Sequence, residues 1–379
     1  MKKIICELPI CMALCLFISN TAFAQQQNGV KIHQEKNKKT TAPVNDKNAK
    51  PIAAVKEQSV LQTEAKKFCD FFKTYEEPSQ FYTVPANEIK DITGKEGTVI
   101  SVNPDDLTTL TNQSVDKAIE VELKELVSQQ QLLKTNAQTM CNGKQLVSGG
   151  AYYINLKSDG QPVKLKPGKS LSVKFPKFTE EPMGLFSGYR DSLGQMQWKQ
   201  RNQTFKKGGP TDAWRDTRNV RIESEGDVLQ FDTIAKRKPK QETKAEVQKK
   251  EAYDKLYTAM DIQNLGWINC DRFYNVTDKT TVSIKISNTT PVSFVSIYLI
   301  FDAINSIVQT HYGAVQKEVS NPGFENIPVG AKARLVAFSL KGDKMMAYEA
   351  PVTVKKDDIF TIFLKEVSEE ELRTLLEKK

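Results

Sequence analysis

The stretch Ala118-Ile119-Glu120-Val121-Glu122-Leu123 decides the fold, because apolar and charged residues alternate along it. Successive side chains of a β-strand point to opposite faces, so Ile119, Val121 and Leu123 share one face of this strand. Such alternation is typical of an antiparallel sheet that has one face on a core and the other in water. The stretch therefore predicts a sheet that is buried on one side.

Similar short strands lie on both sides of this stretch, and turn residues separate them. Asn103-Pro104 follows a predicted strand at 97–102, and Asp159-Gly160 follows another at 151–156. Lys166-Pro167-Gly168-Lys169 precedes a third strand, at 171–175. Short strands with turn residues every ~8–12 residues are typical of a sandwich or barrel. We therefore expect an antiparallel β-sandwich at 79–222.

A second group of strands follows residue 260. Val282, Ile284 and Ile286 alternate with polar residues, and 294–301 is almost continuously apolar, as in the central strand of a sandwich. Turn sequences occur at 321–323 and 328–330, and late strands are expected at 335–338 and 360–364. The pattern predicts a second antiparallel β-sandwich at 261–366.

Three helices are expected beside the sandwiches. Apolar residues spaced by three and four predict an N-terminal helix at about 58–76, whose apolar face packs on the next domain, and an inter-domain helix at about 242–260. Ser368 and Glu371 form a capping box that opens a short C-terminal helix. The apolar positions are Leu61, Ala65, Phe68, Phe72 and Tyr75 in the first helix, and Val247, Ala252, Leu256 and Met260 in the second.

The expected fold class is mainly β with helical connectors, built from two antiparallel β-sandwich domains. Residues 25–56 hold almost no large apolar side chains and are expected to be a disordered spacer. The predicted divisions are a signal peptide at 1–24, the Lys- and Gln-rich spacer at 25–56, a helix at 57–78, the first sandwich at 79–222, a charged linker and helix at 223–260, the second sandwich at 261–366 and a helix at 367–379.

The N-terminus has the three parts of a secretory signal peptide. Lys2 and Lys3 are followed by an apolar run at 8–18 and by the cleavage sequence Ala22-Phe23-Ala24. The run is short for a membrane span, so no transmembrane segment is expected after cleavage. Cys11 and Cys15 do not follow small residues, so lipidation is not expected. We therefore expect an exported protein of the periplasm or the outer-membrane surface.

The net charge of +8 lies mainly outside the predicted sandwiches, at 25–60 and 236–251. A nucleic-acid-binding domain would carry its positive charge on a folded face, so no nucleic acid is expected as a partner. Cleavage also leaves three cysteines, Cys69, Cys141 and Cys270, without a C-x-x-C pair. Three reduced, buried thiols are expected, and one disulfide with one remaining thiol is the alternative.

The sequence offers few groups for catalysis. His33 lies in the spacer, so His311 is the only histidine expected in a fold, and we expect it in a surface loop. No nucleophile elbow accompanies it. The acidic pairs Asp105-Asp106 and Asp357-Asp358 lack the spacing of a calcium loop, and the cysteines lack that of a zinc site. We expect no enzyme, cofactor or metal, although a carboxylate pair would leave no sequence signature.

Two stretches resemble a known family. Between Gly97 and Trp198 the chain contains G-T-V-I-S-V-N-P, A-I-E-V-E-L-K-E-L, L-V-S-G-G-A-Y-Y-I, L-K-P-G-K-S-L-S-V-K-F-P and M-G-L-F-S-G. This resembles the ZU5-like β-sandwich of many exported bacterial proteins. L-G-W-I-N-C-D-R-F-Y, at 265–274, looks like the opening of the second sandwich that accompanies it. The resemblance implies an interaction module, because this architecture serves unrelated binding roles.

Some ZU5 domains of animals cleave themselves at a His-Phe-Ser site. The nearest match here is Leu185-Phe186-Ser187, which lacks the histidine that would activate the serine. No self-cleavage is therefore expected. Phe186 is expected in the core and Ser187 at a strand edge or turn.

The run from Trp267 to Tyr274 is the candidate binding site. In the binding interpretation, Trp267, Phe273 and Tyr274 form an exposed aromatic platform. The polar contacts to a glycan or peptide would then come from Asn269, Asp271 and Arg272. The structural alternative, which we favour, places Trp267 and Cys270 in a core at a domain seam, with Asp271 and Arg272 paired.

These observations favour an exported, non-enzymatic envelope protein that works as an interaction or scaffold module. Its partner would be an envelope or outer-membrane protein, recognised by a sheet edge or a sandwich face. The alternative is a carbohydrate- or surface-binding module that uses the aromatic residues of 267–274. A hydrolase with an unmarked carboxylate or thiol site is the third interpretation.

Overall fold

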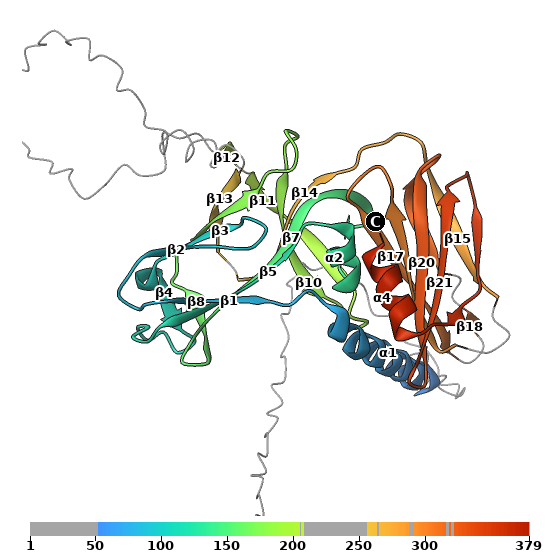
Figure 1. Ribbon diagram of the computed structural model, residues 1–379, viewed down its shortest axis with the longest axis horizontal. Coiled ribbons are helices and arrows are strands. Elements are labelled where there is room, and N and C mark those ends of the chain that lie inside the picture. The colour runs from blue at the N-terminus through green and yellow to red at the C-terminus, as the bar shows by residue number, and fades with distance from the viewer. Residues whose placement is uncertain are drawn as a thin grey trace, which may run out of the picture. The chain divides into compact units, whose positions relative to one another are not determined.

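Four β-sheets and a few short helices make up the described chain (Figure 1). The computed structural model describes residues 52–204, 206–207, 256–263, 265–287, 292–315, 318–319 and 322–378. The expected signal peptide, most of the spacer and the linker up to residue 255 lie outside these residues. The expected mainly β fold with antiparallel sheets is confirmed.

The helices are few and lie at the ends of the chain or between strands. The C-terminal helix begins with the predicted capping box, in which Ser368 and Glu371 bond each other's main-chain N–H groups. A second capping box, of Ser128 and Gln131, opens a helix that was not predicted. The helical segments are α1 (Ile52–Phe72), η1 (Lys73–Tyr75), η2 (Pro104–Asp106), α2 (Gln129–Lys134) and α4 (Glu369–Glu377).

The strands fall into two groups along the chain, here called the N-terminal lobe (β1–β14) and the C-terminal lobe (β15–β23). In the N-terminal lobe they are β1 (Gln80–Val84), β2 (Lys90–Thr93), β3 (Val99–Val102), β4 (Leu107–Thr109), β5 (Ile119–Leu126), β6 (Met140–Cys141), β7 (Lys144–Ser158), β8 (Gln161–Leu165), β9 (Leu171–Pro176), β10 (Gly184–Arg190), β11 (Met196–Thr204), β12 (Lys206–Lys207), β13 (Leu256–Ile262) and β14 (Gly266–Phe273). In the C-terminal lobe they are β15 (Lys279–Ile286), β16 (Phe294–Phe301), β17 (Ile307–Val315), β18 (Glu318–Val319), β19 (Gly323–Pro328), β20 (Lys332–Lys341), β21 (Lys344–Thr353), β22 (Ile359–Ile362) and β23 (Lys365–Glu366).

The N-terminal lobe contains two sheets with a common core. The larger follows the order β1-β5-β7-β14-β10-β11, and the smaller the order β12-β13-β9-β3-β2. Ile119, Val121 and Leu123 of β5 are fully buried in this core, as their alternation predicts. Strand β14 lies between β7 and β10 and is antiparallel to both.

The C-terminal lobe also contains two sheets. One follows the order β18-β17-β16-β20-β21-β23 and the other the order β19-β15-β22. Strand β16 occupies the predicted residues, and all eight of its side chains are buried, as suits a central strand. Strands β15 and β22 are parallel, and the other described pairs are antiparallel.

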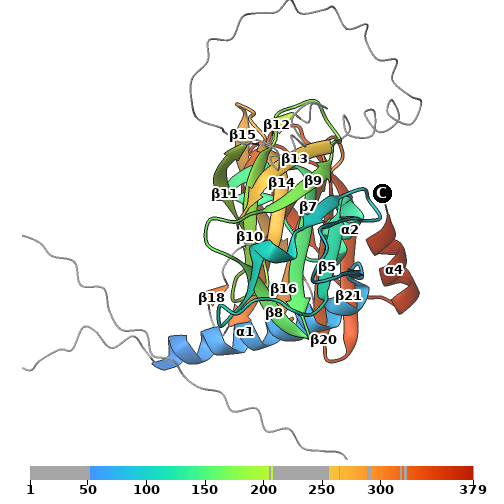
Figure 2. The same cartoon turned by 90° about the vertical axis from the view of Figure 1, so that its left-hand side faces the viewer.

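Helix α1 packs on the C-terminal lobe. The ring of Phe68 lies 5.6 Å from that of Phe294, and the ring of Phe72 lies 5.2 Å from that of Phe338. The sequence analysis expected this face on the sandwich that follows the helix, and its main strand contacts are with β16 and β17 of the C-terminal lobe. Figure 2 shows α1 lying across the lower ends of the strands. Helix α1 also begins at Ile52, within the predicted spacer. Its apolar side chains join strands of both lobes in one buried cluster.

Two further elements differ from the expectation. Residues 256–262 form strand β13, where the end of an inter-domain helix was expected. Strand β14 was expected to open the second sandwich, and it lies within the larger sheet of the N-terminal lobe. The boundary between the lobes therefore falls after residue 273, and the described residues of both lobes belong to a single compact unit. In the described chain, no helix combines the length and apolar character needed to cross a membrane.

Candidate functional site

The predicted binding run lies on strand β14, in the middle of a sheet. Asn269 and Asp271 are both fully buried there. Two residues of β7, Gly149 and Gly150, face the single residue Cys270 at a β-bulge. The bulge requires small residues, because a Cβ on Gly149 would lie 2.7 Å from the carbonyl oxygen of Cys270. The side chains of Asn269 and Asp271 are therefore inaccessible to a ligand in solution, contrary to their predicted role as polar contacts.

The carboxyl group of Asp271 is buried without a basic partner. The Nδ2 atom of Asn269 donates to Oδ2 of Asp271 at 2.5 Å, and Oδ1 of Asp271 has no hydrogen-bond partner among the described residues. Burial raises the pKa of Asp271 well above its usual value, although the hydrogen bond from Asn269 and the nearby Ser148 hydroxyl and Gly149 amide oppose this shift. Asp271 does not pair with Arg272 in the described structure, contrary to the structural alternative considered above.

The aromatic residues of the run do not form an exposed platform. Trp267 is partly buried, with its ring 5.3 Å from that of Tyr153 and 5.6 Å from the guanidinium carbon of Arg190. Phe273 packs against Phe186 at 5.7 Å, and Phe186 is in the core as expected. The remaining candidates, Arg272 and Tyr274, are partly buried at the end of β14.

His311 and the three cysteines offer little reactivity. His311 lies on strand β17, not in a surface loop, and its ring packs on Phe294 at 5.1 Å. Neither ring nitrogen has a hydrogen-bond partner in the described part of the chain, and burial lowers the pKa of His311 to about 4. Cys69, Cys141 and Cys270 form no disulfide. Burial raises the pKa of all three thiols, which disfavours the nucleophilic thiolate.

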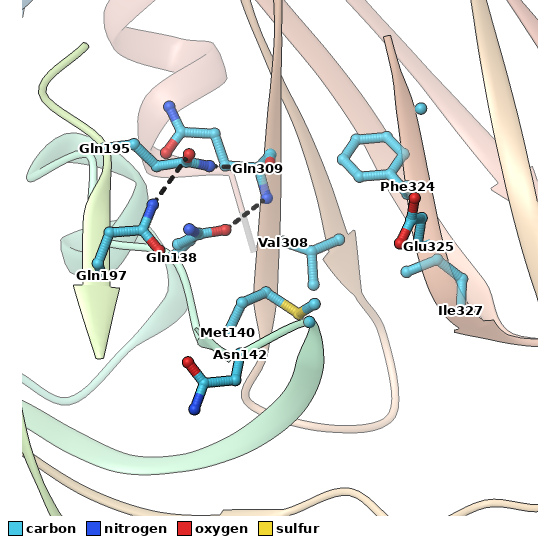
Figure 3. A pocket seen from close by; sticks show the side chains of 12 residues that line it. Gln138, Met140, Asn142, Gln195, Gln197, Val308, Gln309, Phe324, Glu325 and Ile327 are labelled. Carbon is cyan, nitrogen blue, oxygen red and sulfur yellow. Dashed lines mark hydrogen bonds between the residues drawn. The ribbon is translucent and has the colours of Figure 1, made fainter. Parts of the chain in front are cut away.

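A pocket between the two lobes is lined by several polar side chains, most of them amides. It holds about 250 Å³. The N-terminal lobe contributes Gln138, Gln195 and Gln197, and the C-terminal lobe contributes Val308 and Phe324 (Figure 3). Figure 3 shows the glutamines on one side of this inter-lobe pocket and Phe324, Glu325 and Ile327 on the other.

The glutamines of the inter-lobe pocket hold one another in place across the lobes. Gln197 donates to Asp191 at 2.9 Å and to Gln195 at 3.2 Å, and Gln195 donates to the main-chain oxygen of Gln309 at 2.9 Å. The main-chain N–H of Gln309 donates in turn to Oε1 of Gln138 at 3.3 Å. These side chains are therefore oriented before any ligand arrives.

The rim of the inter-lobe pocket is a hairpin turn that the sequence analysis missed. Asn142 and Gly143 connect β6 to β7, with φ angles of 49° and 71°. Two positive φ angles define a type I′ turn, for which Asn-Gly is the strongest sequence signal. Asn326 Nδ2 donates to the oxygen of Gly143 at 3.0 Å and so ties the rim to the C-terminal lobe. The dipeptide could have revealed the hairpin, but not the pocket.

A second cavity, of about 380 Å³, lies between α1 and the turn from β10 to β11. Cys69 and Arg190 are among its lining residues. The Arg190 side chain donates to three main-chain oxygens, those of Thr135, Asn136 and Gly194, at 2.6–2.9 Å. These donors are therefore used within the N-terminal lobe.

Strand β22 presents an exposed apolar edge. It is the last strand in the order β19-β15-β22, so no described strand pairs with its outer side. Ile359 is 64% exposed, Phe363, which directly follows the strand, is 52% exposed, and Thr361 between them is also exposed. Exposed apolar side chains on a free strand edge are a template for pairing with another chain.

Comparison of the chain with protein-family models, with curated proteins and with solved structures gave no match. Among the described residues, no group of three or more His, Cys, Asp or Glu side chains could hold a metal ion.

Proposed function

We propose that the chain is an exported, non-enzymatic protein of the cell envelope that binds a partner protein along strand β22. The occupant of this edge is an extended segment of an envelope or outer-membrane protein. The observation that carries the proposal is the exposed apolar edge of Ile359, Thr361 and Phe363. Addition of a strand to a free sheet edge is a common mode of peptide recognition.

The main chain of β22 has hydrogen-bonding groups to offer. Its carbonyl groups at Asp358 and Ile362 accept from the N–H groups of Ser283 and Ser287 on the β15 side. In a parallel ladder the groups of alternate residues face opposite ways, so those of Ile359 and Thr361 face away from β15. The N–H of Ile359 donates to Oδ1 of Asp358. No described group accepts from the N–H of Thr361, so this N–H is open to an incoming strand.

The side chains of the edge supply the apolar part of the contact. Ile359, Thr361 and Phe363 follow each other at intervals of two and so share one face of the strand. A partner segment with apolar residues at alternate positions would cover Ile359 and Phe363. Burying apolar surface stabilises such a complex by about 25 cal/mol per Å² before the cost of ordering the segment.

Photo-crosslinking in living cells tests the proposal. A photoreactive residue in place of Ile359 is expected to capture a distinct envelope protein. The matched control is the same residue in place of Leu110, which is 59% exposed in the N-terminal lobe. Identical products from both positions, or no protein product from position 359, would contradict the proposal.

A proline substitution separates strand addition from simple apolar contact. Thr361→Pro removes the outward N–H and leaves the β15–β22 bonds in place, because an edge strand tolerates proline on its open side. We expect this variant to lose the crosslinked partner and Thr361→Val to keep it. Capture that survives in a folded Thr361→Pro variant would exclude strand addition. Urea unfolding of both variants shows that the comparison is between folded proteins.

A further inference from the structure

The inter-lobe pocket has walls made of amide groups. A side-chain amide both donates and accepts hydrogen bonds, and it carries no net charge. Gln138, Gln195 and Gln197 line the pocket from one side, and Asn142 lies at its rim. Glu325, on the opposite side, is the only charged side chain among its described lining residues.

Part of the hydrogen-bonding capacity of these amides is unused within the described chain. Both amide hydrogens of Gln197 are donated, to Asp191 and Gln195, but its Oε1 accepts from no described group. The side chain of Asn142 is exposed and has no hydrogen-bond partner among the described residues. The pocket therefore presents an acceptor on one wall and both a donor and an acceptor at its rim.

The remaining surface of the pocket is apolar. Met140, Val308, Phe324 and Ile327 line it, and the last three are almost fully buried. A ligand that fits these walls has groups that both donate and accept, together with an apolar face. A charged ligand would lose its hydration here with few opposite charges to replace it.

We propose that the inter-lobe pocket binds a single uncharged sugar ring. Each hydroxyl of a sugar both donates and accepts, and its C–H face packs on apolar side chains. A volume of about 250 Å³ is below the ~300–1,000 Å³ typical of sites for drug-sized ligands, which favours one ring over a longer chain. An extended peptide would need main-chain partners along a sheet edge, and this pocket offers side-chain amides instead.

The bound sugar would bridge the two lobes. Gln195 and Gln197 belong to the N-terminal lobe, and Phe324 and Ile327 belong to the C-terminal lobe. The Asn326–Gly143 hydrogen bond ties the rim to the C-terminal lobe, and the hydrogen bonds from Gln197 to Asp191 and from Gln195 to Gln309 hold the glutamines in position before binding. A preorganised site loses little conformational freedom when the ligand enters.

Calorimetric titration of the full chain tests the proposal. The probes are glucose, galactose and N-acetylglucosamine, with glucuronate and glucosamine as charged analogues and trialanine amide as the peptide. We expect heat of binding from at least one neutral sugar, and at least tenfold weaker binding of its charged analogue. Tighter binding of the peptide or of a charged sugar, or no binding of any neutral sugar, would overturn the proposal.

Two pairs of variants locate the binding in the pocket. Asn142→Asp replaces the rim donor by a charge and suits the positive φ angle, and Asn112→Asp is its control, at an exposed residue with φ 64°.

Glu325→Trp places a large side chain at the pocket, and Leu110→Trp is its control. We expect Asn142→Asp and Glu325→Trp each to weaken sugar binding at least tenfold, and both controls to leave it unchanged. Unchanged binding in folded Asn142→Asp and Glu325→Trp proteins would place the sugar elsewhere.

Discussion

Asn269 and Asp271 face each other across one residue of strand β14, with the amide nitrogen of Asn269 2.5 Å from the Asp271 carboxyl oxygen. The pair is fully buried in the middle of the larger sheet. Among the described residues no basic side chain accompanies it, and the groups that favour the charged carboxyl there are neutral ones.

The stability of the protein should depend on the proton of Asp271. Because burial raises the pKa of Asp271, the folded chain keeps this proton at pH values where the unfolded chain, with a pKa of about 3.9, has lost it. The free energy of unfolding contributed by this group therefore falls as the pH rises from about 4 through the folded pKa. Asp271→Asn should remove this fall.

Urea unfolding at pH 4 and pH 8 measures this effect. We expect Asp271→Asn to gain stability relative to the unsubstituted protein on going from pH 4 to pH 8. The exposed residue Asp343 provides the control, since Asp343→Asn should show no such trend. A difference between Asp271→Asn and the unsubstituted protein that is equal at both pH values would contradict the prediction.

His311 should have the opposite effect at acid pH. Its pKa is lowered to about 4 by burial, against 6.5 in the unfolded chain. Between these two pKa values the unfolded chain binds a proton at this histidine and the folded chain does not. The free energy of unfolding therefore falls by about 3 kcal/mol as the pH drops from 6.5 to 4. His311→Leu should flatten this decline, as followed by thermal unfolding across the range. His33→Gln is the matched control at the other histidine of the chain, and a decline that persists in His311→Leu would refute the assignment.

The hairpin turn at Asn142 and Gly143 should tolerate only residues that adopt a positive φ angle. Asn142→Ala should cost about 1–2 kcal/mol of stability, because a Cβ without a polar group disfavours the left-handed region. Asn142→Gly should cost less, since glycine adopts this region freely. Chemical denaturation of the two variants gives the comparison. An equal loss of stability in both would show that the side chain of Asn142, not its backbone angle, stabilises the turn.

Gly194 and Cys69 should be coupled across the seam between α1 and the N-terminal lobe. A Cβ on Gly194 would lie 2.4 Å from the Sγ atom of Cys69, and the φ angle of Gly194 is 76°. Gly194→Ala should therefore destabilise the protein by about 1–3 kcal/mol. In a double-mutant cycle, Cys69→Ala should relieve the steric part of this loss but not the part due to φ. Strictly additive effects would mean that α1 shifts to avoid the contact.

Local patterns in the sequence predicted the elements whose structure depends on near neighbours. The apolar run at 294–301 gives a buried strand with the same bounds, and Ser368 and Glu371 open α4 as their spacing indicates. Both depend on residues within one strand or one turn. The alternation at Ile119, Val121 and Leu123 identified a buried face for the same reason.

The arrangement of these elements depends on contacts that the sequence does not display. The sequence of β14 is equally compatible with the first strand of a second domain and with a central strand of the first domain. Its pairing with β7 and β10 places it in the first domain. The apolar face of α1 was predicted, but not that Phe68 would meet Phe294. The inter-lobe pocket was missed because its glutamines come from the turn before β11, from β11 itself and from the segment before β6, and meet Gln309 only in the folded chain.

The position of β14 also sets an order of events during synthesis. A ribosome makes β7 and β10 long before residues 266–273, yet these two strands become neighbours of β14 in the finished sheet. Until that segment is made, each has an edge without its final partner, and such an edge pairs readily with wrong strands. The larger sheet therefore cannot be completed until synthesis has passed residue 273. A newly made chain has to be kept from aggregating for that interval, and a fragment that ends at residue 222 would stay in this unfinished state.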